Sequence, residues 1–199
     1  MKQIICILDN GHGCDTAGKR SPDNKLLEYK WAREMVQRIA KKLQACGIKA
    51  HVLVPEQNDV SLSVRTRRAN ALCAQYGTKN CMLISVHINA ATSSGNWSNA
   101  TGWSGWVAPN ASSNSKRMAQ LLYVEAVKHG LKGNRCVPAC KYWTGNFAIV
   151  RDTHCPAVLT ENLFMDNKQE CEYLLSEHGK ETLTQLHVDA IINYINEQQ

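Results

Sequence analysis

Short apolar runs alternate along this chain with segments in which apolar residues recur every three or four positions. The first run, residues 4–8, ends in Asp-Asn-Gly and predicts a buried strand. In residues 25–45 apolar side chains recur every four residues, and Gly47 follows, so this segment predicts a helix and its end. Both patterns recur along the rest of the chain, so strands and helices alternate.

The remaining elements follow from the same two patterns. Further strands are expected at residues 48–54, 81–86, 105–108, 147–150 and 157–160. Further helices are expected at residues 61–75, 115–129, 168–175 and about 177–195. Alternating strands and helices predict an α/β fold, because crossover connections make strands parallel and place helices on both faces. We therefore expect one domain over residues 1–199, built on a twisted, mostly parallel sheet of about six strands.

The composition is that of a globular protein, and the net charge limits the classes of partner that the protein can be expected to bind. Hydrophobic residues make up 44% of the 199 residues and charged residues 20%, so the chain can bury a core without cross-links. The net charge of +6 favours an anionic partner, but the basic residues are spread along the chain, and we expect no nucleic-acid site. No stretch approaches the ~20 apolar residues of a membrane span, so no stable membrane insertion is expected.

The cysteines and the N-terminal residues indicate where the chain is made. Nine cysteines are present, and several, such as Cys6 and Cys81, lie inside apolar runs. Free buried thiols are typical of a reducing compartment. The first apolar run is too short for the core of a signal peptide, and no small-residue cleavage site follows it. We therefore expect synthesis in the cytoplasm without a signal peptide in this chain.

Four side chains that bind metals or protons lie where the predicted strands end. His12 follows the first strand, His87 closes the strand at 81–86, and Glu161 closes the strand at 157–160. Glu28 lies in the first turn of the first long helix. The carboxyl ends of parallel strands meet at one edge of a sheet, so we expect these four side chains to meet there. Two imidazoles and a carboxylate are a common ligand set for catalytic zinc, and a further carboxylate can take a proton from water.

Each of the four residues alone also has an ordinary structural explanation. His12 suits a glycine-rich turn, Glu28 suits a helix start, and Glu161 suits the cap of a following turn. His87 interrupts an apolar strand, where an unpaired imidazole is costly. Cys14 is an alternative metal ligand because it lies close to His12. Only the joint placement at one sheet edge favours a metal site.

Five segments of the chain surround or adjoin these residues. They are LDNGHGCDTAGKRSP, LLEYKWAREM, SLSVRTRRAN, LISVHINA and PAVLTENLFMDN. In this order, over nearly the whole chain, they resemble the zinc-dependent N-acetylmuramoyl-L-alanine amidases (amidase type 3) of bacterial autolysins and phage endolysins. The resemblance implies zinc bound by His12, Glu28 and His87, with Glu161 as the catalytic carboxylate. One position departs from the family pattern, since Leu163 stands where the family usually has glycine.

The resemblance also implies a reaction and a setting. Zinc-activated water would cleave the amide bond between N-acetylmuramic acid and L-alanine of peptidoglycan, in a single catalytic domain. We expect peptidoglycan as the partner, a monomer, and action on the cell wall after release, as in phage lysis, or after export. Three other functions stay open: a zinc peptidase acting on a bond within the stem peptide, a peptidoglycan-binding module without catalysis, and a nucleic-acid binder.

Contacts to substrate are expected from aromatic, basic and amide side chains near the site. Trp103 and Trp106 lie in a loop-rich stretch, where indole rings either stack on sugars or pack the loop onto the domain. Arg20 and Arg65 either bind peptide carboxylates or form surface salt bridges. Asn89 shares a strand face with the second imidazole, and it either contacts substrate or anchors a loop. Asp9, Ser85 and Asn89 are all near enough in sequence to orient a ligand imidazole.

Overall fold

Strand β1 (Ile5–Asn10) is buried at every position, because helices cover both faces of the sheet to which it belongs. Its side chains alternate between two cores. Cys6 and Leu8 pack into the core on one face, and Ile5 and Ile7 pack into the core on the other. This period of two is the geometry of a pleated strand. The computed structural model describes residues 4–198.

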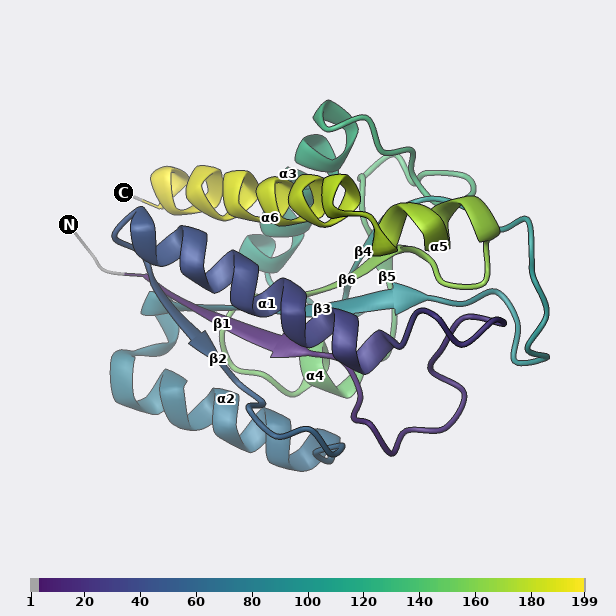
Figure 1. The fold of residues 1–199 in the computed structure, drawn as a ribbon. Helices are drawn as coiled ribbons and strands as arrows, with labels where there is room; N and C mark the ends of the chain where they lie inside the picture. Colours follow the sequence, from purple (N-terminus) through teal and green to yellow (C-terminus); the bar gives the residue numbers. More distant parts are fainter. Residues whose placement is uncertain (1–3, 199) are drawn as a thin grey trace.

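The sheet has six strands in the order β2-β1-β3-β6-β4-β5 (Figure 1). The strands besides β1 are β2 (Lys49–Val52), β3 (Cys81–Asn89), β4 (Ser104–Val107), β5 (Trp143–Thr144) and β6 (Ala157–Phe164). Strands β2, β1, β3 and β6 are parallel to one another, and only β4 runs antiparallel to its neighbour β6. The expected mostly parallel α/β sheet of about six strands is therefore confirmed.

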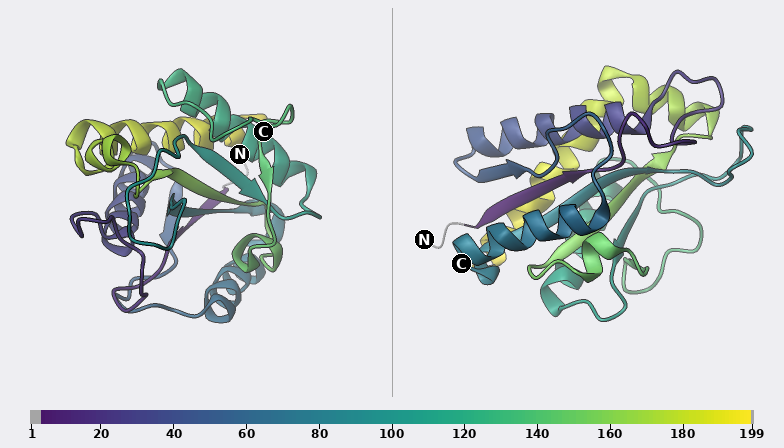
Figure 2. Two further views of the ribbon diagram at one scale, coloured as in Figure 1. Left: turned by 90° about the vertical axis from the view of Figure 1, so that its right-hand side faces the viewer. Right: turned by 90° about the horizontal axis from the view of Figure 1, so that it is seen from below.

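Helices form a layer on each face of this sheet, as the two turned views show (Figure 2). One layer contains α1 (Glu28–Ala45), α3 (Ser113–Lys128), α5 (Lys168–Leu175) and α6 (Glu177–Glu197). The other layer contains α2 (Leu62–Tyr76) and α4 (Ala148–Arg151). Within residues 4–198, none of these helices combines the length and apolar character that crossing a bilayer requires.

Two predictions about the elements differ from the structure. Residues 147–150 were expected as a strand, but Phe147 caps helix α4 and residues 148–150 lie in it, with Ile149 and Val150 buried. Such a short apolar run does not distinguish a buried strand from a buried helical turn. Strands β3 and β6 also extend further than expected, so His87 and Glu161 lie inside their strands and not at the ends.

The long connections after β1 and β3 lie at the carboxyl edge of the sheet. Figure 2 (left) shows this edge, with the loops that follow these two strands in front of the sheet. The first loop leads from β1 to α1, and the second leads from β3 to β4. The fold therefore brings loop residues and strand-end residues together at one edge, as expected for a parallel sheet.

Candidate active site

The turn after β1 is shaped by two glycines on either side of His12. A Cβ atom on Gly11 would lie 2.4 Å from Nδ1 of His87, and one on Gly13 would lie 1.9 Å from the backbone nitrogen of Asp59. No larger residue fits at either position without moving its neighbours. His12 itself has a φ of 57°, in the left-handed region that non-glycine residues seldom adopt. Close packing against His87 and against the backbone of Asp59 therefore requires a glycine on each side of His12.

Glu28 is the first residue of α1 and is fully buried at the carboxyl edge. Its backbone N–H donates to the carbonyl of Lys19 over 3.0 Å, which fixes the start of the helix. Its Oε1 accepts the backbone N–H of Ile88 over 3.0 Å and lies 3.1 Å from Nδ1 of His87. Its Oε2 lies 3.6 Å from Nε2 of His12 and has no hydrogen-bond partner. The carboxylate thus lies between the two imidazoles with one oxygen unsatisfied.

His12, Glu28 and His87 form the geometry expected of a metal site. One ligand atom of each residue lies within 4.8 Å of the others, and the two imidazole rings stand edge to face with centroids 5.1 Å apart. The other ring nitrogen of His87, Nε2, lies 3.1 Å from Oγ of Ser85. Ser85 Oγ in turn donates to Asp9 Oδ2 over 2.5 Å. Of the three residues considered for orienting an imidazole, Ser85 is therefore the one in contact with His87, and Asp9 acts through it.

Glu161 lies next to this cluster, on β6. It is paired in register with His87 of β3, and its Oε2 is buried without a hydrogen-bond partner. Burial, with a smaller contribution from the negative charge of Glu28, raises the pKa of Glu161 to about 7. A carboxyl group with a pKa near neutrality can both accept and return a proton at physiological pH.

Burial and neighbouring charges also shift the pKa values of the other members of the cluster. Burial lowers the pKa of the His12 imidazole to about 4, so this ring is neutral and able to bind a metal. Burial opposes ionisation of Glu28, but its bond with His87 and the backbone N–H of Ile88 lower its pKa overall. The carboxylate is therefore charged while the His12 ring is neutral. Burial opposes protonation of His87, but its bond with Glu28 raises the pKa of that ring overall.

A cleft of about 610 Å³ is lined by His12, His87 and Glu161, and Glu28 lies buried behind it. Its walls include Lys19 from the loop before α1, Leu62 from α2, and Phe147 before α4. The side chains of Leu62 and Phe147 are exposed although they are large and apolar. None of the three was predicted to line a site, because their place in the cleft wall depends on how distant loops meet.

Arg65 lines this cleft but is almost fully buried, with 3% of its side chain exposed. It forms salt bridges with Asp9 over 2.7 Å and with Asp59 over 3.0 Å. Its remaining N–H groups donate to backbone carbonyls, including that of Val60. All its hydrogen-bonding capacity is used within the protein, so the salt-bridge alternative describes Arg65, although its guanidinium is buried and not at the surface.

The two tryptophans of the loop-rich stretch are placed differently from each other. Trp103 is completely buried and donates its indole N–H to Oδ1 of Asn162 over 2.9 Å. A ring in that position cannot stack on a sugar, so the packing explanation holds for Trp103. Trp106 is half-buried and lies edge to face against Phe147, with ring centroids 5.6 Å apart. It therefore supports the cleft wall from behind.

Asn89 and Arg20 lie outside the metal cluster. The Oδ1 of Asn89 accepts the N–H of Ala90 over 2.9 Å, and the carbonyl of Asn89 accepts the N–H of Met165 over the same distance. These bonds support loop anchoring, one of its two expected roles. Arg20 is exposed in the loop before α1 and lines a second cavity beside the catalytic cleft.

Leu163, at the position where the family usually has glycine, keeps the backbone that a glycine would adopt. Its φ is 66°, and it lies where the pairing between β3 and β6 shifts after His87 and Glu161. Such a bulge with a left-handed residue commonly contains glycine. The Leu163 side chain is buried in the core with Met165, and this packing offsets the unfavourable φ. The strand that carries Glu161 is therefore shaped as in a glycine-containing bulge.

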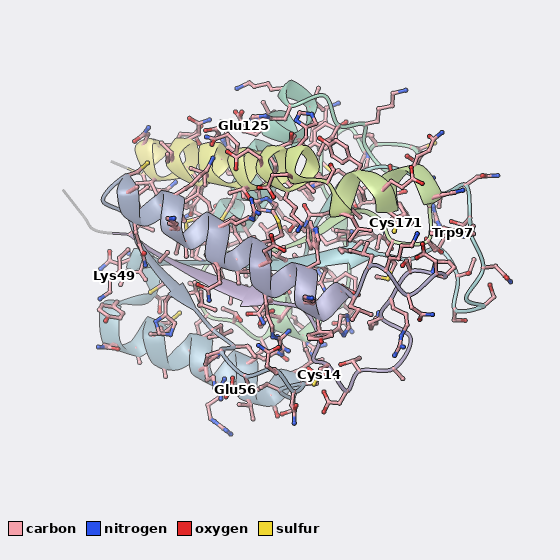
Figure 3. The ribbon with its side chains drawn as sticks, in the orientation of Figure 1. Cys14, Lys49, Glu56, Trp97, Glu125 and Cys171 are labelled. Carbon is pink, nitrogen blue, oxygen red and sulfur yellow. The ribbon has the colours of Figure 1, made fainter. Side chains whose placement is uncertain are left out.

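The other potential metal ligands are accounted for by the protein itself. Cys14 is exposed beyond the Gly-His-Gly turn, near the start of α2, and its thiol donates to Oδ1 of Asn58 over 3.2 Å (Figure 3). A second group, Glu125, His129 and Asp189, also lies close enough to share an ion. There, however, Lys128 already forms a salt bridge with Glu125. A cation of the protein thus occupies that position.

Comparison with known proteins gives consistent results. The profile of a family described as N-acetylmuramoyl-L-alanine amidase matches residues 6–193. The endolysin of Bacillus phage SPP1 is 29% identical over 198 residues, which cover 95% of this chain and 65% of that protein. The amidase CwlM of Bacillus licheniformis is 26% identical, over 97% of this chain and 69% of that protein. The chain thus spans about two thirds of the length of these two relatives.

Solved structures share the fold over almost all of the chain. An N-acetylmuramoyl-L-alanine amidase from Clostridium difficile 630 superposes with a TM-score of 0.84 at 23% identity, covering 100% of both chains. The catalytic domain of CwlV from Bacillus (Paenibacillus) polymyxa var. colistinus gives a TM-score of 0.80 at 24% identity, covering 97% of this chain and 98% of that one. These likenesses establish the architecture.

Proposed function

Because the chain belongs to the N-acetylmuramoyl-L-alanine amidase family, we propose that it hydrolyses the amide bond between N-acetylmuramic acid and L-alanine in peptidoglycan, with zinc as its cofactor. The observation that carries the proposal is the buried Glu28 carboxylate between two imidazoles, with Oε2 unpartnered. A buried oxygen of this kind costs free energy unless a ligand satisfies it. A divalent cation held by His12, Glu28 and His87 would do so.

The donor set suits zinc in particular. Two imidazole nitrogens and one carboxylate oxygen are typical ligands for a catalytic zinc ion, which leaves a further position free. When bound, zinc lowers the pKa of a water molecule toward ~7 and polarises the substrate carbonyl. Ser85 and Asp9 hold the His87 ring from behind, so the imidazole is oriented before any ligand arrives.

Glu161 supplies the proton transfers of the reaction. Its Oε2 has no partner within the described residues and lies in the same cleft as the imidazoles. We assign it the proton released as water attacks the lactyl carbonyl, and the return of that proton to the departing alanine nitrogen. A pKa of about 7 favours both transfers at neutral pH. One chain carries all four residues, so we propose that a monomer acts on the cell wall.

The amine that hydrolysis exposes distinguishes this function from the open alternatives. Purified peptidoglycan is digested with the zinc-loaded protein, and the new amino termini are identified by labelling and mass spectrometry. We expect new L-alanine amines only. New amines on other stem residues would instead make the protein a peptidase, and digestion without any new amine would leave only a binding function.

The metal requirement is tested on the same digest with Glu28→Gln. This variant should bind at least 10-fold less zinc by elemental analysis and release no alanine amine, because the buried charge of the ligand set is lost. Glu34→Gln on the same helix is the matched control, since Glu34 pairs with Arg38 and Lys180 away from the cleft. Normal zinc content in Glu28→Gln would contradict the proposed ligand set.

A further inference from the structure

Two cavities meet at Lys19. The catalytic cleft of about 610 Å³ is lined by His12, His87 and Glu161, and Lys19 forms part of its wall. A second cavity of about 580 Å³ lies between the loop at residues 17–24 and the loop at residues 90–96, and Lys19 also lines this one. The side chain of Lys19 thus borders both the reacting centre and the neighbouring space.

Lys19 and Arg20 are the cations available to a ligand in this area. Neither side chain forms a salt bridge or hydrogen bond with any of residues 4–198. The other cations of the cleft are occupied, since Arg65 is bound by Asp9 and Asp59, and Arg151 is paired with its neighbour Asp152. An anionic group of a ligand would therefore be attracted to the junction of the two cavities.

Lys19 lines the same cleft as His12 and Glu161, and its positive charge acts on both side chains. Burial lowers the pKa of His12 to about 4, and the charge of Lys19 acts in the same direction. Burial raises the pKa of Glu161 to about 7, and Lys19 opposes this rise. Together with the shared cavity wall, these effects indicate that a ligand group near Lys19 lies close to the scissile bond.

Both walls of the second cavity are held by hydrogen bonds. On one side, the carbonyl of Lys19 accepts the backbone N–H of Glu28, and Arg20 pairs with Leu27. On the other side, Oδ2 of the buried Asp166 accepts the N–H groups of Ala91 and Thr92 over 2.9 and 3.1 Å. The cavity is therefore preformed, which is usual for a ligand site.

The lining of the second cavity suits a peptide more than a sugar. Small and polar residues dominate it, and no aromatic ring is among them. Sugar rings are commonly bound by flat aromatic surfaces, which this cavity does not offer. In the proposed substrate, the second stem residue is a γ-linked D-glutamate whose α-group is either a free carboxylate or a carboxamide. Two extended residues span ~7 Å, so this group follows the scissile amide closely.

We propose that Lys19, assisted by Arg20, binds the α-carboxylate of the second stem residue, so that the protein prefers stem peptides with a free D-glutamate over those with the amidated residue. The inference rests on the proposed amidase function and names the substrate class of the same site. Lysine ammonium and carboxylate form a charge-assisted hydrogen bond in a partly desolvated cavity. A carboxamide in the same place offers no charge.

The preference is measured with two soluble muropeptides, N-acetylmuramoyl-L-alanyl-γ-D-glutamyl-L-lysine and its D-isoglutaminyl counterpart, which differ only in this α-group. We expect kcat/KM to favour the acid by about 10-fold in the wild-type protein, a ratio typical of one hydrogen bond to a charged group. In Lys19→Met the ratio should fall to about one, whereas Lys19→Arg should keep most of the preference. Lys25→Met is the matched control and should keep the wild-type ratio, because Lys25 is exposed beside Asp23.

An unchanged ratio in Lys19→Met would overturn the proposal, as would a wild-type ratio near one. Failure of the amidase function itself has a separate signature, namely no hydrolysis of either compound. In that case the tripeptides L-alanyl-γ-D-glutamyl-L-lysine and L-alanyl-D-isoglutaminyl-L-lysine are titrated into the zinc-loaded protein by calorimetry. Tighter binding of the acid that Lys19→Met abolishes supports the subsite, and equal binding of the two tripeptides overturns it.

Discussion

Two buried polar clusters lie side by side at the carboxyl edge of the sheet, and they differ in how completely they are satisfied. In the first, Arg65 donates to Asp9, to Asp59 and to the carbonyls of Asn10 and Val60. The second oxygen of Asp9 accepts the hydroxyl of Ser85. The guanidinium and the carboxylate of Asp9 thus have partners within the protein.

The second cluster contains His12, Glu28, His87 and Glu161 and is just as deeply placed, but two of its carboxylate oxygens have no partner. Burial raises the pKa of Glu161 to about 7. Glu28 is also buried, but its bonds with His87 and the backbone N–H of Ile88 lower its pKa overall, so it keeps its charge. Native proteins rarely leave buried polar atoms unpaired. The contrast indicates that the Arg65 cluster maintains the fold, and it supports the proposal that a metal ion completes the Glu28 cluster.

The largest effect is expected at the unsatisfied cluster. Glu161→Gln should lower kcat for alanine release by about 10²- to 10⁴-fold, because the proton acceptor is lost. Its zinc content should match the wild type, and its free energy of unfolding should change by less than about 1 kcal/mol, because no existing bond is broken. Glu172→Gln, an exposed residue on α5, is the control. Retention of more than about one tenth of the activity would assign the proton transfer to another group.

The satisfied cluster should respond in the opposite way. Arg65→Met should lower the free energy of unfolding by about 3–5 kcal/mol, because it leaves the Asp9 carboxylate buried without its cation. Arg68→Met on the same helix is the matched control. Arg68 pairs with Glu56 at the surface, with about a third of its side chain exposed, and its loss should cost less than about 1 kcal/mol. Urea unfolding measures both values.

The same Arg65 variant sharpens the comparison between structure and substrate binding. Its effect should appear in stability, with KM for muropeptides changed little at temperatures where the variant is folded. If Arg65→Met were as stable as the wild type and raised KM strongly, the guanidinium would belong to the substrate site. The two buried clusters would then not differ in the way that their hydrogen bonds indicate.

The pattern of apolar residues predicted most of this fold, because its signals are local. Alternating runs and four-residue repeats located the central strands and long helices within a few residues of their bounds. The segment at 147–150 failed because four apolar residues fit a helical turn or a strand equally well. The short strand at Trp143–Thr144 has too few residues to carry any periodicity.

The candidate site was predictable to the extent that the sheet edge itself determines it. His12, Glu28 and His87 lie together as expected, because parallel strand ends converge. The placement of Arg65 and Trp103 was not accessible, because their burial depends on distant partners. Arg65 is covered by Asp9, which lies 56 positions away in sequence, and the indole of Trp103 is covered by Asn162, which lies 59 positions away.

A third buried polar group, His187, extends the comparison to helix α6, which packs on one face of the sheet. Its side chain is fully buried, with Nδ1 2.7 Å from the carbonyl of Leu183 and Nε2 3.1 Å from Oγ1 of Thr160. Both nitrogens therefore have partners, as in the Arg65 cluster. Burial lowers the pKa of His187 to about 4, so the folded protein holds this ring neutral.

This pKa predicts the smallest of the three effects, a loss of stability in acid. The unfolded chain binds a proton at His187 near pH 6.5 and the folded protein only near pH 4, so the unfolded state binds more protons between these values. Stability should be retained above pH 6.5, and the contribution of this group should fall by about 3 kcal/mol as the pH drops to 4.

The variant His187→Leu lacks this pH-dependent contribution, although it is less stable than the wild type at neutral pH. Urea unfolding between pH 7 and 4 should therefore show the gap between the two proteins narrowing with acid, because titrations at the catalytic edge are common to both and cancel. His178→Gln, exposed on the same helix, should follow the wild type throughout. A gap that stays constant with pH would mean that His187 accepts its proton in the folded protein, and that bonding at both nitrogens does not keep a buried group uncharged.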